Sequence, residues 1–147
     1  MRIRASAMVV VEGELLVLVY QYPRGDILAI PGGGVREGET VAEAIVREYR
    51  EELCMTVEVG ELRYVGDMLA RDDIPQTLHV VFEARITSGE PEINPGQTSA
   101  SAFAWVPLED LPRRGVYPDI GRAIMEDGLD GATKGRYLGN CMMRDWA

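Results

Sequence analysis

Residues 31–55 read PGGGVREGETVAEAIVREYREELCM, and this stretch decides the fold that we expect for the chain. Thr40 precedes a run with helical periodicity, and Glu43 stands three residues later. Threonine and glutamate at this spacing form a capping box, in which each side chain accepts a hydrogen bond from the other residue's backbone N–H. The sequence therefore predicts an amphipathic helix from Val41 to about Leu53.

The predicted helix carries three acidic residues beside its apolar face. At about 100° per residue, one apolar sector is formed by Val41, Ala42, Ile45, Val46, Tyr49 and Leu53. Glu48, Glu51 and Glu52 cluster at one edge of that sector, and their spacing of three and four makes the carboxylates neighbours that repel. A bound cation would relieve the repulsion, and oxygen ligands suit Mg²⁺ or Mn²⁺. Taken alone, the run also fits a solvated acidic face in which Arg47 pairs with Glu51.

A glycine run stands immediately before this helix. Gly32, Gly33 and Gly34 follow Pro31, and glycines let a backbone approach a ligand closely. Their carbonyl oxygens can also ligate a metal ion beside carboxylates. A plain turn explains the run equally well when it is taken alone.

The rest of the chain predicts mixed strands with few helices. A hairpin with Gly13 in its turn, a loop over 23–26 and a short strand over 27–30 come first. Strands are expected over 57–66, 77–86, 103–106 and around 136–138, a loop over 88–101, a helical turn over 108–111 and a second helix over 118–126. This order indicates an α+β or α/β sandwich, with helices covering a sheet.

The composition excludes several classes of protein. The chain has 147 residues, enough for one domain with a core, and a net charge of -9, which argues against an electrostatic grip on long nucleic acid. It has no apolar run of about 18 residues, so no membrane span is expected, and no signal peptide is recognised. Two distant cysteines, Cys54 and Cys141, predict reduced thiols. A cytoplasmic protein is the expectation.

The segment from Gly33 to Met55 resembles the Nudix box. That motif is a glycine, five residues, a glutamate, seven residues, then Arg-Glu, an apolar residue, any residue and Glu-Glu. Every charged position matches, since Glu39, Arg47, Glu48, Glu51 and Glu52 stand at the required spacing. Trp105 to Leu111 also resembles a strand-and-turn element found late in such domains. The resemblance implies an α/β/α sandwich with a mixed central sheet, one domain over residues 1–147 with 128–147 as a C-terminal extension, and a homodimer.

The resemblance also assigns roles. Glu48, Glu51, Glu52 and the Gly33 carbonyl would bind Mg²⁺ or Mn²⁺, and Glu51 or Glu48 would take a proton from the attacking water. Arg47 would orient the glutamates, while Glu39, with Gly32 and Gly33, would shape the loop. The implied reaction is hydrolysis of a phosphoanhydride bond in a nucleoside diphosphate derivative, such as a nucleoside triphosphate or a nucleotide sugar. A nucleotide-binding sensor without catalysis is the alternative.

The chain departs from the family pattern in three places, one of which is Leu28, where many members have an aromatic residue before Pro-Gly-Gly. Cys54 replaces the glycine that ends the helix, at a cost of about 1 kcal/mol if the residue is left-handed. Members of the family also use a late glutamate as a further ligand or base, and only Glu90 and Glu92 stand near that region.

Substrate contacts are sought in residues that precede the glycine run. Arg4, Tyr20 and Arg24 are candidates to stack on a base or to hold a terminal phosphate. They fit the rim of a loop equally well. His79, the one histidine, stands in an apolar strand and is expected to be structural.

Overall fold

The computed structural model describes residues 1–128 and 135–140. In chain order its elements are β1 (Arg2–Met8), β2 (Val10–Val11), β3 (Glu14–Tyr22), β4 (Gly25–Ala29), β5 (Gly32–Gly34), α1 (Val41–Leu53), β6 (Thr56–Met68), β7 (Thr77–Ser88), β8 (Ala102–Pro107), the 3₁₀ turn η1 (Leu108–Asp110), α2 (Leu111–Arg114), α3 (Gly121–Asp127) and β9 (Arg136–Asn140).

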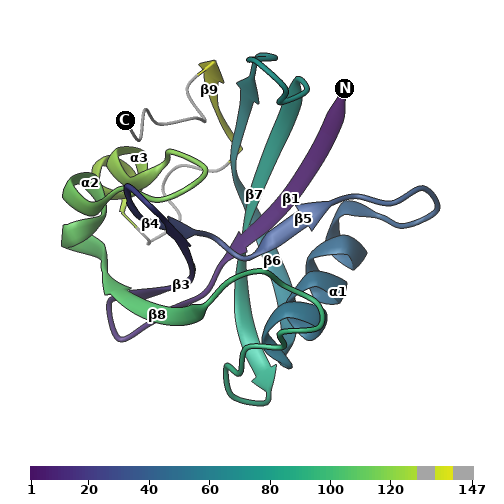
Figure 1. Ribbon diagram of the computed structural model, residues 1–147, viewed down its shortest axis with the longest axis vertical. Coiled ribbons are helices and arrows are strands. Elements are labelled where there is room, and N and C mark those ends of the chain that lie inside the picture. The colour runs from purple at the N-terminus through teal and green to yellow at the C-terminus, as the bar shows by residue number, and fades with distance from the viewer. Residues whose placement is uncertain (129–134, 141–147) are drawn as a thin grey trace.

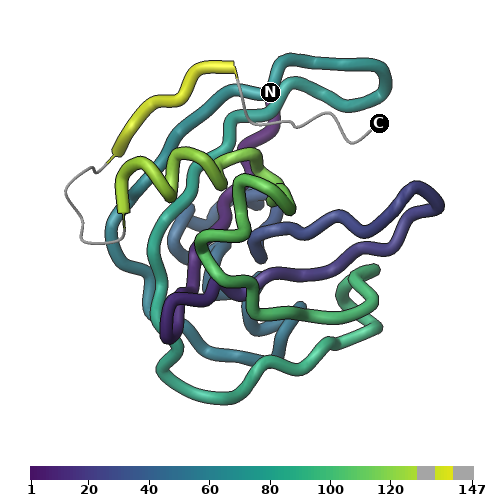
Figure 2. The backbone as a smooth tube through the Cα atoms, turned by 90° about the vertical axis from the view of Figure 1, so that its left-hand side faces the viewer, coloured from purple at the N-terminus to yellow at the C-terminus, as the bar shows by residue number. Residues whose placement is uncertain are grey.

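The strands form two sheets. The first has the order β5-β1-β7-β6-β9 and is mixed, because β1 runs parallel to β7 whereas β6 and β7 are antiparallel. In the second, β3 pairs with β2, β4 and β8. Figure 2 shows the β3–β4 hairpin projecting from the body of the molecule.

Helices lie on the two outer sides of the sheets, with α1 against the first sheet and α2 and α3 beyond the second (Figure 1). One buried cluster joins α1 to β1 and β3 through residues such as Ile45, Tyr49 and Leu16. A second cluster joins α3 to β3 and β6 through Ile124, Leu15 and Tyr64. This layering confirms the predicted α/β/α sandwich with a mixed sheet.

Helix α1 begins and ends at the predicted residues. The Thr40 hydroxyl accepts from the Glu43 N–H at 3.1 Å, and the Glu43 carboxylate accepts from the Thr40 N–H at 3.2 Å. At the other end, Cys54 is left-handed with φ 57° and ψ 32°, and its N–H donates to Arg50 and Tyr49. The exposed cysteine therefore occupies a conformation that favours glycine.

We expect Cys54→Gly to raise the free energy of unfolding by up to about 1 kcal/mol, because glycine adopts the left-handed conformation without the Cβ penalty. Cys54→Ala keeps that penalty and serves as the matched control. Chemical denaturation of the three proteins measures the effect. Equal stability of the glycine and alanine variants would show that the left-handed residue is not strained.

The glycine run is neither a turn nor a loop. Gly32, Gly33 and Gly34 form β5, which pairs antiparallel with Ser6, Ala5 and Arg4 of β1. A Cβ on Gly32 would lie 2.2 Å from the Ala5 carbonyl oxygen. The glycines therefore allow β5 to pack closely against its neighbours, which a reading from turn propensity misses.

Other expectations need correction. The helix predicted from Pro118 begins at Gly121, because residues 118–120 form a tight turn in which the Ile120 N–H donates to the Pro118 carbonyl at 2.8 Å. Pro112, expected to end the preceding helical turn, lies instead in the first turn of α2, where a missing N–H costs nothing. The predicted strand near the end of the chain is β9, which pairs parallel with β6. The other residues of the 128–147 extension, 129–134 and 141–147 with Cys141, lie outside the described residues.

No helix within the described residues is long and apolar enough to cross a membrane.

Candidate active site

The buried face of α1 is rotated about the helix axis relative to the face that the sequence predicts. Ala44 is fully buried, whereas Ala42, placed in the apolar sector by the sequence, is exposed. The reason is that α1 packs against β1, β5 and β6, and the residues that it buries there are Ala44, Ile45, Tyr49, Glu52 and Leu53. Glu52 consequently lies within the buried face, only 6% exposed, and not at its edge.

The buried carboxylate of Glu52 lacks the hydrogen bonds that would offset its loss of hydration. Its Oε1 atom has no hydrogen-bond partner among the described residues. Burial, the charge of Glu48 and a hydrogen bond to Glu48 raise the pKa of Glu52 to about 8. A buried unpaired carboxylate costs stability unless it is protonated or bound to a cation. This pair therefore favours a positive ligand.

Gly33 brings the β5 backbone against the second carboxylate. A Cβ added to Gly33 would lie 2.3 Å from Glu48 Oε1 and 2.6 Å from its carboxyl carbon. The same addition to Gly34 meets nothing within 4 Å. Gly33 is thus needed for the close approach of the strand to Glu48, and Gly34 is not.

Arg47 holds the remaining acids of the motif. Its guanidinium donates to both carboxylate oxygens of Glu39, at 2.7 and 3.0 Å, to Glu48 at 2.8 Å and to Glu51 at 3.3 Å. A further bond reaches the Gly34 carbonyl at 3.0 Å. Arg47 therefore ties the glycine strand to α1. Hydrogen bonds from Arg47 and the Arg36 N–H lower the pKa of Glu39 to about 2.

The three predicted metal ligands are not drawn together. Glu48 and Glu52 interact, but Glu51 is turned towards Arg47 and towards Arg36, at 3.8 Å. Accordingly, the part of the chain that the structure describes holds no ready cluster of three acidic, histidine or cysteine side chains for a metal ion. The oxygen-rich Glu48–Glu52 pair, with its open Oε1, still fits a hard divalent cation.

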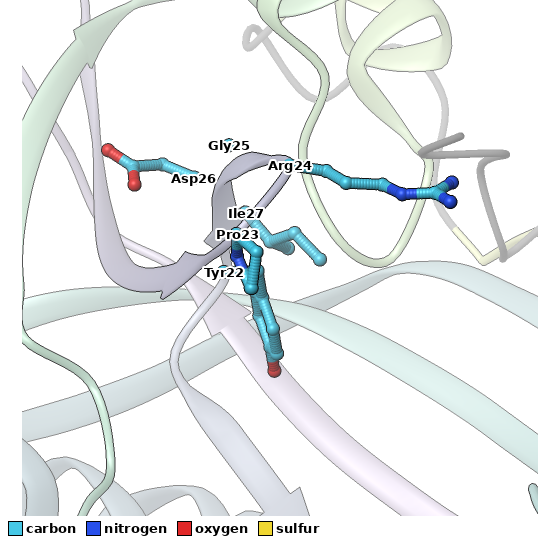
Figure 3. Close-up of a pocket in the computed structure, with 6 residues that line it drawn as sticks. All are labelled: Tyr22, Pro23, Arg24, Gly25, Asp26 and Ile27. Atoms are coloured by element: carbon cyan, nitrogen blue, oxygen red, sulfur yellow. The ribbon is translucent and has the colours of Figure 1, made fainter.

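A cavity of about 480 Å³ lies beside this strand. Its lining residues are Arg2, Arg4, Tyr20, Tyr22, Ile27, Ala29, Gly32, Gly33, Ile74 and Tyr117. Two of the three predicted substrate contacts, Arg4 and Tyr20, are among them. Arg24 is not, since it lies at the tip of the β3–β4 hairpin over a different cavity of about 400 Å³. In Figure 3 its side chain extends away from Tyr22.

Arg4, His79 and Tyr117 form a polar group at the cavity wall. Arg4 Nη2 donates to the Ile30 carbonyl at 2.8 Å, and its guanidinium carbon lies 5.1 Å from the centre of the Tyr117 ring. The Tyr117 hydroxyl is 3.2 Å from His79 Nε2. Burial and the charge of Arg4 lower the pKa of His79 to about 4, so the fully buried imidazole is neutral at pH 7.

The loop between β7 and β8 reaches the glutamates through Thr98 and not through an acid. The Thr98 side chain forms hydrogen bonds that lower the pKa values of Glu52 and Tyr20, against the larger effect of burial. The loop backbone is attached to α1, since the Asn94 N–H donates to the Glu52 carbonyl at 3.1 Å. Glu90 and Glu92 are exposed.

Sequence reasoning missed Tyr117, Arg2 and Thr98. Tyr117 reaches the cavity because its backbone pairs with β4, donating to the Leu28 carbonyl and accepting from the Ile30 N–H, both at 2.8 Å. The two segments are about ninety residues apart in the sequence, and no local sequence pattern predicts such a contact. The aromatic residue before Pro118 was the one available signal.

Comparison with known proteins places this chain in a recognisable group. The family model described as the NUDIX domain matches residues 1–126. The chain is similar to the "NAD-capped RNA hydrolase NudC" of Photorhabdus laumondii, with 30% identity over 118 residues, and to that of Pseudomonas aeruginosa, with 32% over 127 residues. These matches cover 80% and 85% of this chain but 44% of each relative. The chain thus spans less than half the length of these curated relatives.

Solved structures show the same fold. The MutT NUDIX hydrolase from Burkholderia pseudomallei superposes with a TM-score of 0.71 at 28% identity, covering 87% of this chain and 98% of its own. A NUDIX hydrolase from Nitrosomonas europaea gives 0.74 at 17% identity, covering 95% and 77%.

Proposed function

Because this chain belongs to the NUDIX family, we propose that it is a pyrophosphohydrolase that cleaves a phosphoanhydride bond with a divalent metal ion, Mg²⁺ or Mn²⁺. One observation carries the proposal: the buried Glu52 carboxylate faces Glu48 with an unpartnered oxygen, which is costly for a metal-free protein. The retention of every acid in the motif supports catalysis over binding alone.

The metal ligands in this proposal are Glu48, Glu52, the Gly33 carbonyl and Glu51. Glu51 joins them through its Oε1 atom by giving up the 3.8 Å contact with Arg36, which is accessible enough to exchange, with 29% of the Glu51 side chain exposed, while its Oε2 atom keeps the hydrogen bond from Arg47. The bound ion would neutralise charge on the diphosphate and lower the pKa of the attacking water.

The side chains around the metal site then have separate tasks. Glu51 and Glu48 are the two candidates to accept the proton of the attacking water. Arg47 orients both through charge-assisted hydrogen bonds. Glu39 anchors Arg47 and, through the Arg36 N–H at 2.8 Å, the loop before α1.

The substrate class that we propose is a nucleoside diphosphate derivative, either a nucleoside triphosphate or a nucleotide sugar or dinucleotide. The cavity supports it, since three tyrosines supply stacking surfaces and two arginines supply positive charge. The relatives are named for the hydrolysis of NAD-capped RNA, whereas the net charge of -9 favours a small molecule. A single domain over 1–147, a homodimer and a cytoplasmic location remain predictions.

A substrate screen tests the proposal. The chain is incubated with nucleoside triphosphates, nucleotide sugars, ADP-ribose and NAD, with Mg²⁺, with Mn²⁺ and with a chelator. Release of phosphate, pyrophosphate or a nucleoside monophosphate that depends on the metal is the expected result. Tight binding of one of these compounds without turnover would instead identify a nucleotide sensor.

The two glycines of β5 offer a matched pair of variants. We expect Gly33→Ala to lower turnover about tenfold or more, because the new Cβ would displace the Glu48 carboxylate and an ångström of misplacement is costly to catalysis. Gly34→Ala, which meets open space, should stay close to the wild type. Steady-state rates on the best substrate measure both. Equal loss in the two variants would mean that β5 itself is disturbed and that Glu48 is not the cause.

A further inference from the structure

Arg4 is a cation without a carboxylate partner. Among the described residues, no salt bridge within 4.0 Å includes it, and its buried Nη1 atom has no hydrogen-bond partner. A buried charge is normally paired, and a buried donor without a hydrogen-bond partner costs free energy. Arg4 therefore carries an unsatisfied capacity for an anion.

The other sides of the guanidinium are already fixed. Nη2 donates to the Ile30 carbonyl, and the Tyr117 ring lies against the guanidinium face. Tyr117 is itself held by His79 and by its backbone bonds to β4. The guanidinium is therefore held in one orientation before any ligand arrives, which reduces the entropy that binding must offset.

Arg4 also lies between the two halves of the site. It lines the cavity that contains Tyr20, Tyr22 and Tyr117. Arg4 is also the β1 residue that pairs with Gly34 of β5. The charges of Glu52 and Glu48 act on it directly. A group bound at Arg4 would thus stand at the junction between the tyrosines and the glutamates.

From this arrangement we propose that Arg4 binds the phosphate group attached to the nucleoside of the substrate, while the tyrosines of the cavity hold the nucleoside. The proposal rests on the proposed function for the identity of the ligand. A planar guanidinium suits the task because it can donate to a phosphate and to Ile30 at the same time, whereas an ammonium group has no fixed fork. Arg2, at the exposed start of β1, is not needed for this contact.

The test is a binding cycle that isolates the contact between Arg4 and the phosphate. AMP, GMP, CMP and UMP are compared with the corresponding nucleosides, with Mg²⁺ and with a chelator, by calorimetry on the wild type and on Arg4→Met. These monophosphates contain no phosphoanhydride bond, so binding is measured without turnover. The ratio of monophosphate to nucleoside affinity should be about tenfold or more higher in the wild type than in the variant.

Two further variants make the cycle decisive. Arg85→Met removes an exposed arginine that pairs with Glu58 at the far end of β7, and it should leave the ratio unchanged. If Arg4→Met does not fold, Arg4→Lys is used, and its ratio should be at least about threefold below that of the wild type. A ratio in the Arg4 variant within twofold of the wild type, or no binding of any monophosphate to the wild type, would overturn the assignment.

This outcome is separable from that of the substrate screen. Loss of the phosphate preference in Arg4→Met, together with no hydrolysis of any substrate by the wild type, would leave Arg4 as a phosphate contact in a protein that binds without cutting. Metal-dependent hydrolysis with an unchanged ratio in Arg4→Met would keep the enzyme and reject the role of Arg4.

Discussion

Glutamine in place of Glu52 is expected to lower turnover at least about a hundredfold and, at the same time, to raise the melting temperature of the metal-free protein. The loss of activity follows because a bound metal contributes several kcal/mol to the transition state, and each ~1.4 kcal/mol is a factor of ten in rate. The gain in stability follows because a neutral amide removes the repulsion between Glu52 and Glu48 in a buried position.

The stability gain should depend on pH in a defined direction. The pKa of Glu52 is raised from 4.5 to about 8 in the folded protein, so the native state binds a proton that the unfolded chain has lost. The cost of ionising Glu52 therefore develops as the pH rises from about 4.5 to about 8 and is constant above that. The melting temperature of the wild type should fall below that of Glu52→Gln across this pH window, and the two melting temperatures should converge below pH 4.5.

Calorimetric melting in chelator between pH 4 and 9, with steady-state rates in Mg²⁺, measures both effects. Glu43→Gln is the control on the same helix, and its turnover should equal that of the wild type. Because this change also alters the capping box, its melting temperature is compared separately. A Glu52→Gln protein that melts at the wild-type temperature at every pH would show that the carboxylate is compensated in solution. Wild-type turnover in that variant would remove Glu52 from the metal site.

Methionine in place of Arg47 should be the most destabilising single change in the motif, by roughly 3 kcal/mol. The side chain is only 17% exposed and is the shared donor to Glu39, Glu48, Glu51 and the Gly34 carbonyl. Its removal leaves three carboxylates close together without their cation, so β5 and α1 lose their polar connection. Denaturant unfolding at pH 7 measures the loss, and turnover should fall with it.

Arg50→Met provides the comparison, because Arg50 lies on the exposed side of the same helix; it should change stability by less than about 0.5 kcal/mol.

The acid limb of the curve of unfolding free energy against pH adds a second check. The pKa of Glu39 is lowered to about 2 chiefly by Arg47, so this interaction stabilises the fold above about pH 4.5 and is lost as the pH falls towards 2. Arg47→Met should lose that dependence, and an unchanged acid limb would show that another group holds Glu39.

The parts of the fold that local rules govern were predictable from the sequence. The helix from Val41 to Leu53 begins at a threonine with a glutamate three residues on, and both capping hydrogen bonds form. The left-handed conformation at Cys54 follows from the position where a helix must end. The hairpin at Gly13 follows from two apolar, β-branched runs separated by a turn, and β6 and β7 lie close to the predicted ranges 57–66 and 77–86.

The parts that depend on what packs against what were not predictable. Periodicity predicts an apolar sector for the helix, but the strands β1, β5 and β6 decide which side is covered, so Ala44 and Glu52 are buried and Ala42 is exposed. The glycine run forms a strand because it pairs with β1, and Gly32 and Gly33 are needed there because β1 and Glu48 leave no room for a Cβ. The cavity wall contains Tyr117, which comes from a distant segment, and excludes Arg24, which precedes the glycine run in the sequence.

Binding of Mn²⁺, followed by electron paramagnetic resonance, tests most directly whether the carboxylates of α1 form a metal site. The free ion gives a signal that disappears when it binds, so the wild type and Glu52→Gln can be titrated without any substrate. We predict saturable binding by the wild type and an affinity at least about tenfold lower in Glu52→Gln, with Glu43→Gln unchanged. Equal Mn²⁺ affinity in the wild type and in Glu52→Gln would contradict the account.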